Sequence, residues 1–287
     1  MSIVITGATG QLGQHVIAEL LDRGVAAGQI VALGRSAEKL ATLAERGVEV
    51  RAMDYDDAAT VAAALKGASK VLLISSSEVG KRLAQHRAVI DAAKAEGVEL
   101  FAYTSIANAG TTAMTLAAEH QATEGLIENS GLPAVILRNG WYLENYTEQL
   151  AGTLAQGAMA GSAGEGKVSA ATRADFATAA AAVLVADNQA GAVYELGGDT
   201  AFSMAELAAT ISDVSGTTVA YNDLPAADFS SLLKGAGVPE AFADILADSD
   251  RGIARGDLFV DGTQLSDLIG RPTTTMADAV RAAHAAL

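Results

Sequence analysis

Residues 1–20 read MSIVITGATGQLGQHVIAEL and contain the motif that decides the fold. The run from Ser2 to Thr6 is apolar and β-branched, which is typical of a buried strand. Gly7, Gly10 and Gly13 follow at intervals of three, and the apolar residues after them recur at the spacing of an amphipathic helix. This order predicts a strand, a tight turn and a helix.

The three glycines suit a phosphate-binding turn. Without a Cβ the backbone can turn tightly and approach a pyrophosphate, which then lies at the positive end of the following helix. The spacing is G-x-x-G-x-x-G rather than G-x-G-x-x-G, and glycines alone also form ordinary turns. Their place between a first strand and a helix favours dinucleotide binding. We therefore expect a dinucleotide to bind at Gly7, Gly10 and Gly13.

Short apolar runs recur along the first half of the chain, with helical stretches between them. They cover residues 30–33, 48–52, 71–74, 100–103 and 134–137. Strands that are apolar on both faces and alternate with helices indicate a parallel sheet covered on both sides. The predicted fold class is α/β, a Rossmann-type doubly wound parallel sheet with a small, mostly helical C-terminal lobe.

Composition excludes several kinds of site. The chain of 287 residues has no cysteine, so disulfides, thiolate nucleophiles and Cys-ligated metals are excluded, and any redox role needs a bound cofactor. None of the four histidines has metal-ligand spacing, so no metal site is expected. The net charge of -15 opposes nucleic-acid binding, which needs clustered Lys and Arg.

The hydropathy pattern indicates a cytoplasmic protein. No apolar run approaches the roughly 18 residues needed to span a bilayer, so no membrane segment is expected. The N-terminus enters strand-like residues without a basic flank or a cleavage site, so no signal peptide is expected.

The second predicted strand ends at Ala32-Leu33-Gly34-Arg35, near the expected adenosine ribose. A carboxylate at this point would bind a 2′-hydroxyl, whereas a cation pairs with a 2′-phosphate. Arg35 therefore favours NADP over NAD, the alternative being an ordinary surface arginine.

Beyond about Glu144 the regular alternation loosens. Ser203 and Thr275 each precede an acidic residue by three places, which is the capping-box pattern of a helix start. Residues 224–255 are helical in composition, and residues 193–196 could add a strand to the sheet.

From these patterns we expect two domains. Residues 1–144 form an NADP-binding Rossmann domain, and residues 145–287 form mainly a substrate lobe. A segment of about 168–198 returns to the main domain.

The usual acid for carbonyl reduction is missing. In such folds a Tyr is followed four residues later by a Lys, whose charge lowers the phenol pKa so that it can protonate an alkoxide. None of the six tyrosines has Lys at that offset. The absence argues against an ordinary alcohol dehydrogenase or sugar epimerase.

Polar side chains follow the later strands, where open α/β sheets bind ligands. Residues 75–77 are all serine, and Ser105 ends the next strand; both could instead cap loops. His120 lies on an apolar helix face and is either a catalyst or a packed side chain. Trp141 and Tyr142 follow the sixth strand, where they could stack on a flat ligand or close the joint between lobes.

These segments together resemble the NmrA-like branch of the atypical short-chain dehydrogenase/reductases. The likeness runs over essentially the whole chain. It is carried by GATGQLG at 7–13, LLISSSEVG at 72–80, AYTS at 102–105, RNGWY at 138–142, ATRAD at 171–175, VYEL at 193–196 and PTTT at 272–275.

The resemblance implies an NADPH site. It assigns to NADPH the residues Gly7, Ala8, Thr9, Gly10, Gln11, Leu12, Arg35, Ser75, Ser76, Ser77, Asn139, Gly140, Trp141, Tyr142, Leu143, Glu144 and Arg173. It also implies that His120 stands where the wider superfamily has its catalytic Tyr, with Glu124 in place of the Lys. His120 and Ser105 are therefore the candidate catalytic residues.

The implied activity is hydride transfer from NADPH to quinones. The product of transfer is a hydroquinone anion, a phenolate with a pKa near the Tyr value of about 10, so a dedicated acid is less needed than for an alkoxide. With one nucleotide fingerprint, we expect direct transfer without a flavin. The alternative is an NADP(H)-binding redox sensor without turnover. An isomerase or an isoflavone-type reductase is disfavoured because a suitably placed Lys is absent. A homo-oligomer is left open.

Overall fold

The computed structural model describes residues 2–287, which divide into two compact units. The first unit contains the described residues up to Ile106, together with Glu119–Asn139 and Arg173–Tyr194. The second contains Ala107–Ala118, Gly140–Thr172 and Glu195–Leu287.

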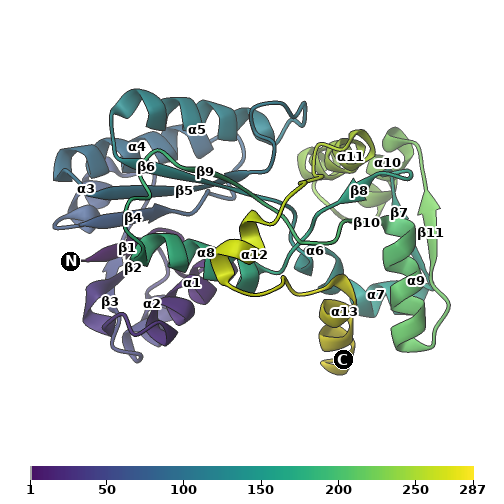
Figure 1. Cartoon of the computed structure of the whole chain (residues 1–287). Coiled ribbons are helices and arrows are strands. Elements are labelled where there is room, and N and C mark those ends of the chain that lie inside the picture. Colours follow the sequence, from purple (N-terminus) through teal and green to yellow (C-terminus); the bar gives the residue numbers. More distant parts are fainter. Residues whose placement is uncertain (1) are drawn as a thin grey trace. The chain divides into compact units, whose positions relative to one another are not determined.

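The first unit is built on a seven-stranded sheet with the order β3-β2-β1-β4-β5-β6-β9 (Figure 1). The strands are β1 (Ile3–Ile5), β2 (Ile30–Gly34), β3 (Glu49–Ala52), β4 (Lys70–Leu73), β5 (Leu100–Ile106), β6 (Ala134–Asn139) and β9 (Val193–Leu196). β1 to β6 pair in parallel, with Val4 opposite Val31 on one side and Val71 on the other. The predicted doubly wound parallel sheet is confirmed.

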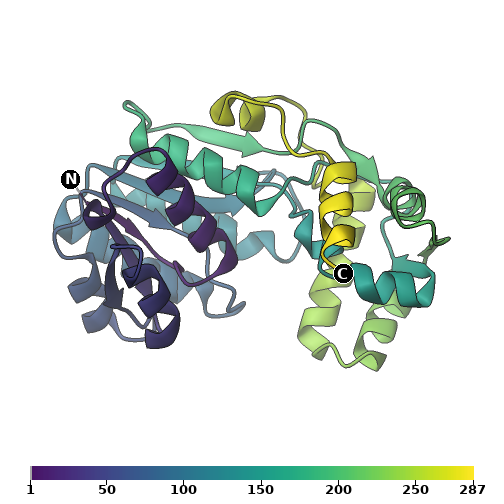
Figure 2. The same cartoon turned by 90° about the horizontal axis from the view of Figure 1, so that it is seen from below.

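Helices cover both faces of this sheet, as a sheet that is apolar on both faces requires. They are α1 (Gln11–Asp22), α2 (Ala37–Ala44), α3 (Ala58–Leu65), α4 (Arg82–Glu96), α5 (Ala117–Ser130) and α8 (Arg173–Val185), with a 3-10 turn at Ala27–Gln29. α4 and α5 lie on one face, and α1 packs beside α8 on the other (Figures 1 and 2).

Local chemistry sets the helix ends. The Ser36 hydroxyl caps α2 by accepting from the Lys39 N–H, and the Asp57 carboxylate caps α3. Gly97 ends α4 with φ of 65°, which a residue with a Cβ rarely adopts. Gly34 is the last residue of β2, and a Cβ there would lie 2.7 Å from Thr9 Cγ2.

The second unit is mostly helical, as expected. Its helices are α6 (Glu144–Thr147), α7 (Leu150–Gln156), α9 (Met204–Ser215), α10 (Ala226–Gly235), α11 (Glu240–Arg255), α12 (Gln264–Ile269) and α13 (Met276–Ala285). Ser203 and Glu206 form the predicted capping box of α9, and Thr275 caps α13 through the Asp278 N–H. Within residues 2–287, no helix is long and apolar enough to cross a membrane.

The sequence pattern does not predict two small sheets in this unit. β8 (Lys167–Val168) pairs antiparallel with β10 (Phe202–Ser203), and β7 (Ala158–Gly161) pairs in parallel with β11 (Ala220–Asp223). Ala, Gly, Asn and Asp are poor strand formers. β7 and β11, which consist mostly of these residues, therefore form through pairing between distant segments rather than through local preference.

A glycine-to-alanine pair tests the packing of α1 against the turn that precedes it. A Cβ at Gly13 would lie 2.5 Å from the Gly7 carbonyl oxygen, so we expect Gly13→Ala to lower the free energy of unfolding by about 1–3 kcal/mol. Gly125→Ala is the matched control, because its Cβ on α5 meets no atom within 4 Å; it should raise stability by roughly 0.5–1 kcal/mol. Equal effects in denaturant unfolding would contradict the close approach.

Candidate functional site

The glycine turn joins β1 to α1 at the carboxyl end of the sheet. Gly7 has φ of 60°, and its carbonyl accepts from the Gly10 N–H at 2.9 Å. Gly10 is the N-cap residue of α1 and has no side chain to cap the first turn. The first N–H groups of α1 therefore remain available for an anion, and the helix dipole favours a negative charge there. This cradle fits a pyrophosphate.

Neighbouring strands hold the turn in place. The Ala8 N–H donates to the Leu33 carbonyl of β2 at 3.1 Å. On the other side, the Ile74 N–H after β4 donates to Thr6 Oγ1 at 3.0 Å. The turn is thus fixed to the ends of β2 and β4, and Arg35 follows β2 directly. The Arg35 side chain is 62% exposed and forms an ion pair with Glu78 at 3.0 Å.

Three side chains of α4 hold Ser76 in the serine segment 75–77. The Ser76 N–H donates to His86 Nε2 at 3.0 Å, its carbonyl accepts from Arg82 Nε at 2.6 Å, and its hydroxyl donates to Gln85 Oε1 at 2.6 Å. The preceding Ser75 N–H donates to Thr104 Oγ1 at 2.9 Å. The segment is therefore positioned before any ligand arrives.

The sequence motifs do not identify these three α4 residues as part of the site. Arg82, Gln85 and His86 lie at positions i, i+3 and i+4, so they share one helix face. All three are buried, and a polar face on a helix that must cover a sheet is the signal that could have identified them.

A cluster of buried polar side chains adjoins this segment through His86. Because His86 Nε2 accepts from Ser76, its hydrogen is on Nδ1, which lies 3.0 Å from Thr123 Oγ1. The Tyr103 hydroxyl lies 2.8 Å from His120 Nδ1. Burial, reinforced by the nearby Arg82 charge, lowers the pKa of both histidines to about 3. His120 is therefore neutral near pH 7, and burial raises the Tyr103 pKa, which keeps the phenol protonated.

The resemblance implies that Glu124 stands in place of the superfamily Lys. The negative charge of this carboxylate is neutralised by Arg138. Arg138 binds Glu124 through two nitrogens, Nε at 3.0 Å and Nη2 at 2.7 Å. The Ser105 hydroxyl also donates to this carboxylate. The Ser105 proton is thus engaged with Glu124 and is held away from the role of an acid.

Asn139, the last residue of β6, is 5% exposed, and its Oδ1 has no hydrogen-bond partner. A buried amide oxygen without a donor is costly, and a ligand amide would satisfy it. The fit to a nicotinamide carboxamide is therefore good. Gly140–Glu144 belong to the second unit, where the Gly140 N–H donates to Leu196 and the Leu143 N–H to Ala171.

The predicted site residues are divided between the units. The first unit holds the glycine turn, Arg35, the serine segment, Ser105, His120, Asn139 and Arg173, which begins α8. The second unit holds Gly140, Trp141, Tyr142, Leu143 and Glu144. Among residues 2–287 no cluster of His, Asp and Glu side chains could hold a metal ion.

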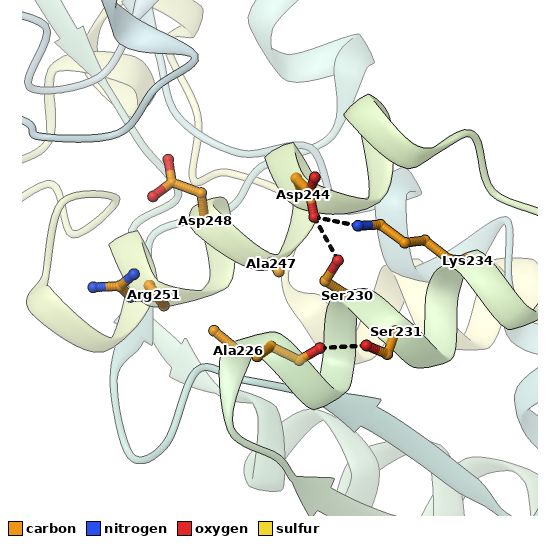
Figure 3. A pocket seen from close by; sticks show the side chains of 9 residues that line it. Ala226, Ser230, Ser231, Lys234, Asp244, Ala247, Asp248 and Arg251 are labelled. Atoms are coloured by element: carbon orange, nitrogen blue, oxygen red, sulfur yellow. Dashed lines mark hydrogen bonds and ion pairs between the residues drawn. The ribbon is translucent and has the colours of Figure 1, made fainter.

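The second unit also contains a hollow of about 380 Å³ between α10 and α11 (Figure 3). Asp244 pairs with Lys234 at 2.9 Å and accepts from Ser230 at 2.6 Å. Small and charged side chains form the rest of its wall. This polar lining does not suit a flat apolar molecule, which needs aromatic or aliphatic walls.

The sequence model of the NmrA-like family matches residues 1–258. The chain belongs to the NmrA-like family. Quinone oxidoreductase 2 of Escherichia coli (strain K12) is 51% identical over 97% of each protein. This membership confirms the resemblance that the glycine turn, the serine segment and the RNGWY stretch carried.

Two solved structures of similar proteins have the same fold. An Escherichia coli NADPH-dependent quinone oxidoreductase, complexed with NADPH, has a TM-score of 0.94 and 51% identity, over 97% of this chain and 98% of that chain. Citrobacter triphenylmethane reductase, complexed with NADP(H), has a TM-score of 0.94 and 38% identity, over 98% of this chain and 100% of that one.

The buried histidines predict acid sensitivity. An unfolded histidine binds a proton below about pH 6.5, whereas native His120 does so only near pH 3. The unfolded state then binds more protons, so stability falls as the pH drops from about 6.5 to about 3. His120→Gln removes one such group and should reduce this slope by up to about 1.4 kcal/mol per pH unit.

The control for this prediction is His15→Gln, since His15 is exposed on α1. Asp250, whose pKa burial raises to about 6, contributes with the opposite sign but is common to all variants. The free energy of unfolding is measured in denaturant at several pH values. A His120→Gln slope equal to that of the unchanged protein would contradict the neutral buried histidine.

Proposed function

We propose that this protein is an NADPH-dependent oxidoreductase that transfers hydride directly to quinones and gives hydroquinones. The observation that carries the proposal is the uncapped first turn of α1, with Arg35 following the neighbouring strand. The similarity to an NADPH-dependent quinone oxidoreductase over nearly the whole chain supports it. Turnover is favoured over the sensor alternative for the same reason.

Each part of the site has a task in this proposal. NADPH supplies the hydride when it is bound. The α1 N-terminus holds the pyrophosphate, Arg35 holds the 2′-phosphate, and the serine segment supports the ribose beside the nicotinamide. Asn139 Oδ1 accepts a hydrogen bond from the carboxamide. Orienting the two reactants in this way is the main catalytic contribution of the chain.

Proton supply is not the difficult step. Transfer to a quinone leaves a phenolate, whose pKa of about 10 is far below that of an alkoxide. His120 is neutral at working pH, so we assign it a hydrogen bond to the acceptor oxygen rather than the donation of a full proton. Ser105 is bonded to Glu124 and is the weaker candidate. The proton then comes from solvent.

A cationic triphenylmethane dye is a second candidate acceptor. Citrobacter triphenylmethane reductase shares 38% of its residues with this chain at a TM-score of 0.94. A dye cation becomes neutral on taking up hydride and needs no proton, and the net charge of -15 attracts cations.

The cytoplasmic location of the protein and its assembly into a homo-oligomer remain predictions.

Turnover is tested by adding a benzoquinone to the purified protein with NADPH and following the loss of absorbance of the reduced nicotinamide. We expect saturable oxidation of NADPH that is faster than oxidation of NADH at equal concentration. A dye cation in a parallel assay tests the second acceptor. Saturable NADPH binding without turnover of any quinone would favour the sensor.

Arg35→Ala tests the cofactor assignment. Loss of the cation removes a charge-assisted bond to the 2′-phosphate, which NADH lacks, so the Kd for NADPH should rise about tenfold or more and that for NADH little. Arg46→Ala, on an exposed turn after α2, is the control for lost positive charge. Equal weakening of both cofactors would remove Arg35 from this role.

A further inference from the structure

A chain of ion pairs connects Arg35 to the loops after β3 and β4. Arg35 Nη1 lies 3.0 Å from one carboxylate oxygen of Glu78, and Lys81 Nζ lies 3.4 Å from the other. Lys81 also pairs with Asp56 at 3.2 Å. Arg35, the residue proposed to bind the 2′-phosphate, therefore already has an anionic partner, Glu78, from its own unit.

The position of Glu78 depends on the held serine segment. The Glu78 N–H donates to Ser76 Oγ at 3.2 Å, and Ser76 is bonded to Arg82, Gln85 and His86 of α4. From the other end of the chain of ion pairs, Asp56 accepts from Gln85 Nε2 at 3.2 Å. The Glu78 backbone is thus held where its carboxylate reaches Arg35.

We propose that Glu78 competes with the 2′-phosphate of NADPH for Arg35 and so sets the degree of preference for NADPH over NADH. This inference rests on the proposed function, in which Arg35 binds that phosphate. Both groups are anions, so the carboxylate repels a phosphate that approaches the same guanidinium. NADH has a neutral 2′-hydroxyl there, so its binding leaves the Arg35–Glu78 pair intact.

The competition is modest in size. Arg35 is 62% exposed and Glu78 28% exposed, and an exposed ion pair is worth about 0–1 kcal/mol. Glu78 also has a second cation in Lys81, to which it remains bonded when it leaves Arg35. The pair therefore reduces NADPH affinity without preventing binding.

Glu78→Gln tests this proposal, because it removes the charge and keeps the shape. The Kd values for NADPH and NADH are measured by the fluorescence of the reduced nicotinamide. We expect the NADPH Kd to fall about two- to fivefold and the NADH Kd to stay the same or rise. Glu99→Gln is the matched control, since it removes one exposed carboxylate at the amino end of β5 and should change neither value.

A double variant separates this proposal from the proposed function. In an Arg35→Ala background, Glu78→Gln should give a smaller gain in NADPH affinity than in the unchanged protein, because the competition for Arg35 is absent and only the repulsion between carboxylate and phosphate remains. An unchanged or weaker NADPH Kd in Glu78→Gln, or equal tightening of both cofactors, would overturn the competition. If Arg35→Ala instead weakens both cofactors equally, the 2′-phosphate assignment itself fails.

Discussion

The close approach of α1 to the end of β1 is the constraint on which the site depends. Gly13 packs against the Gly7 carbonyl, and Gly7 takes a positive φ, so the chain turns within a few residues from strand to helix. The turn brings the uncapped N-terminus of α1 to the carboxyl edge of the sheet, between the ends of β2 and β4. Arg35, which follows β2, and the serine segment, which follows β4, come from the two strands that flank β1.

The charged side chains near the serine segment differ in burial. The guanidinium of Arg82 is buried and, together with burial itself, keeps His86 and His120 neutral. Arg35 and Glu78 are partly exposed and form an ion pair with each other. Arg82 and His86 therefore hold the backbone of Ser76 in place, whereas the exposed Arg35–Glu78 pair can exchange partners when a phosphate arrives.

Local sequence predicted the parts of the fold that local preference decides. β-branched runs predicted the strands, and glycines between a strand and a helix predicted the turn. Local sequence does not predict contacts between distant residues: the partners of Arg35 and of Arg138 follow from the order of strands, and β7 and β11 pair although most of their residues are poor strand formers. The helical spacing of His120 predicted that it faces the core, but spacing carries no information on its protonation.

The central claim is direct hydride transfer from NADPH to the quinone, with orientation as the main contribution of the protein. Single-turnover reduction of a benzoquinone by NADPH deuterated at one or the other C4 position tests it most directly, because a cofactor held by the α1 N-terminus, Arg35 and Asn139 presents one face of the nicotinamide. We predict that deuterium at one position slows the transfer and that deuterium at the other does not. Equal rates for both deuterated forms and for unlabelled NADPH would contradict the account.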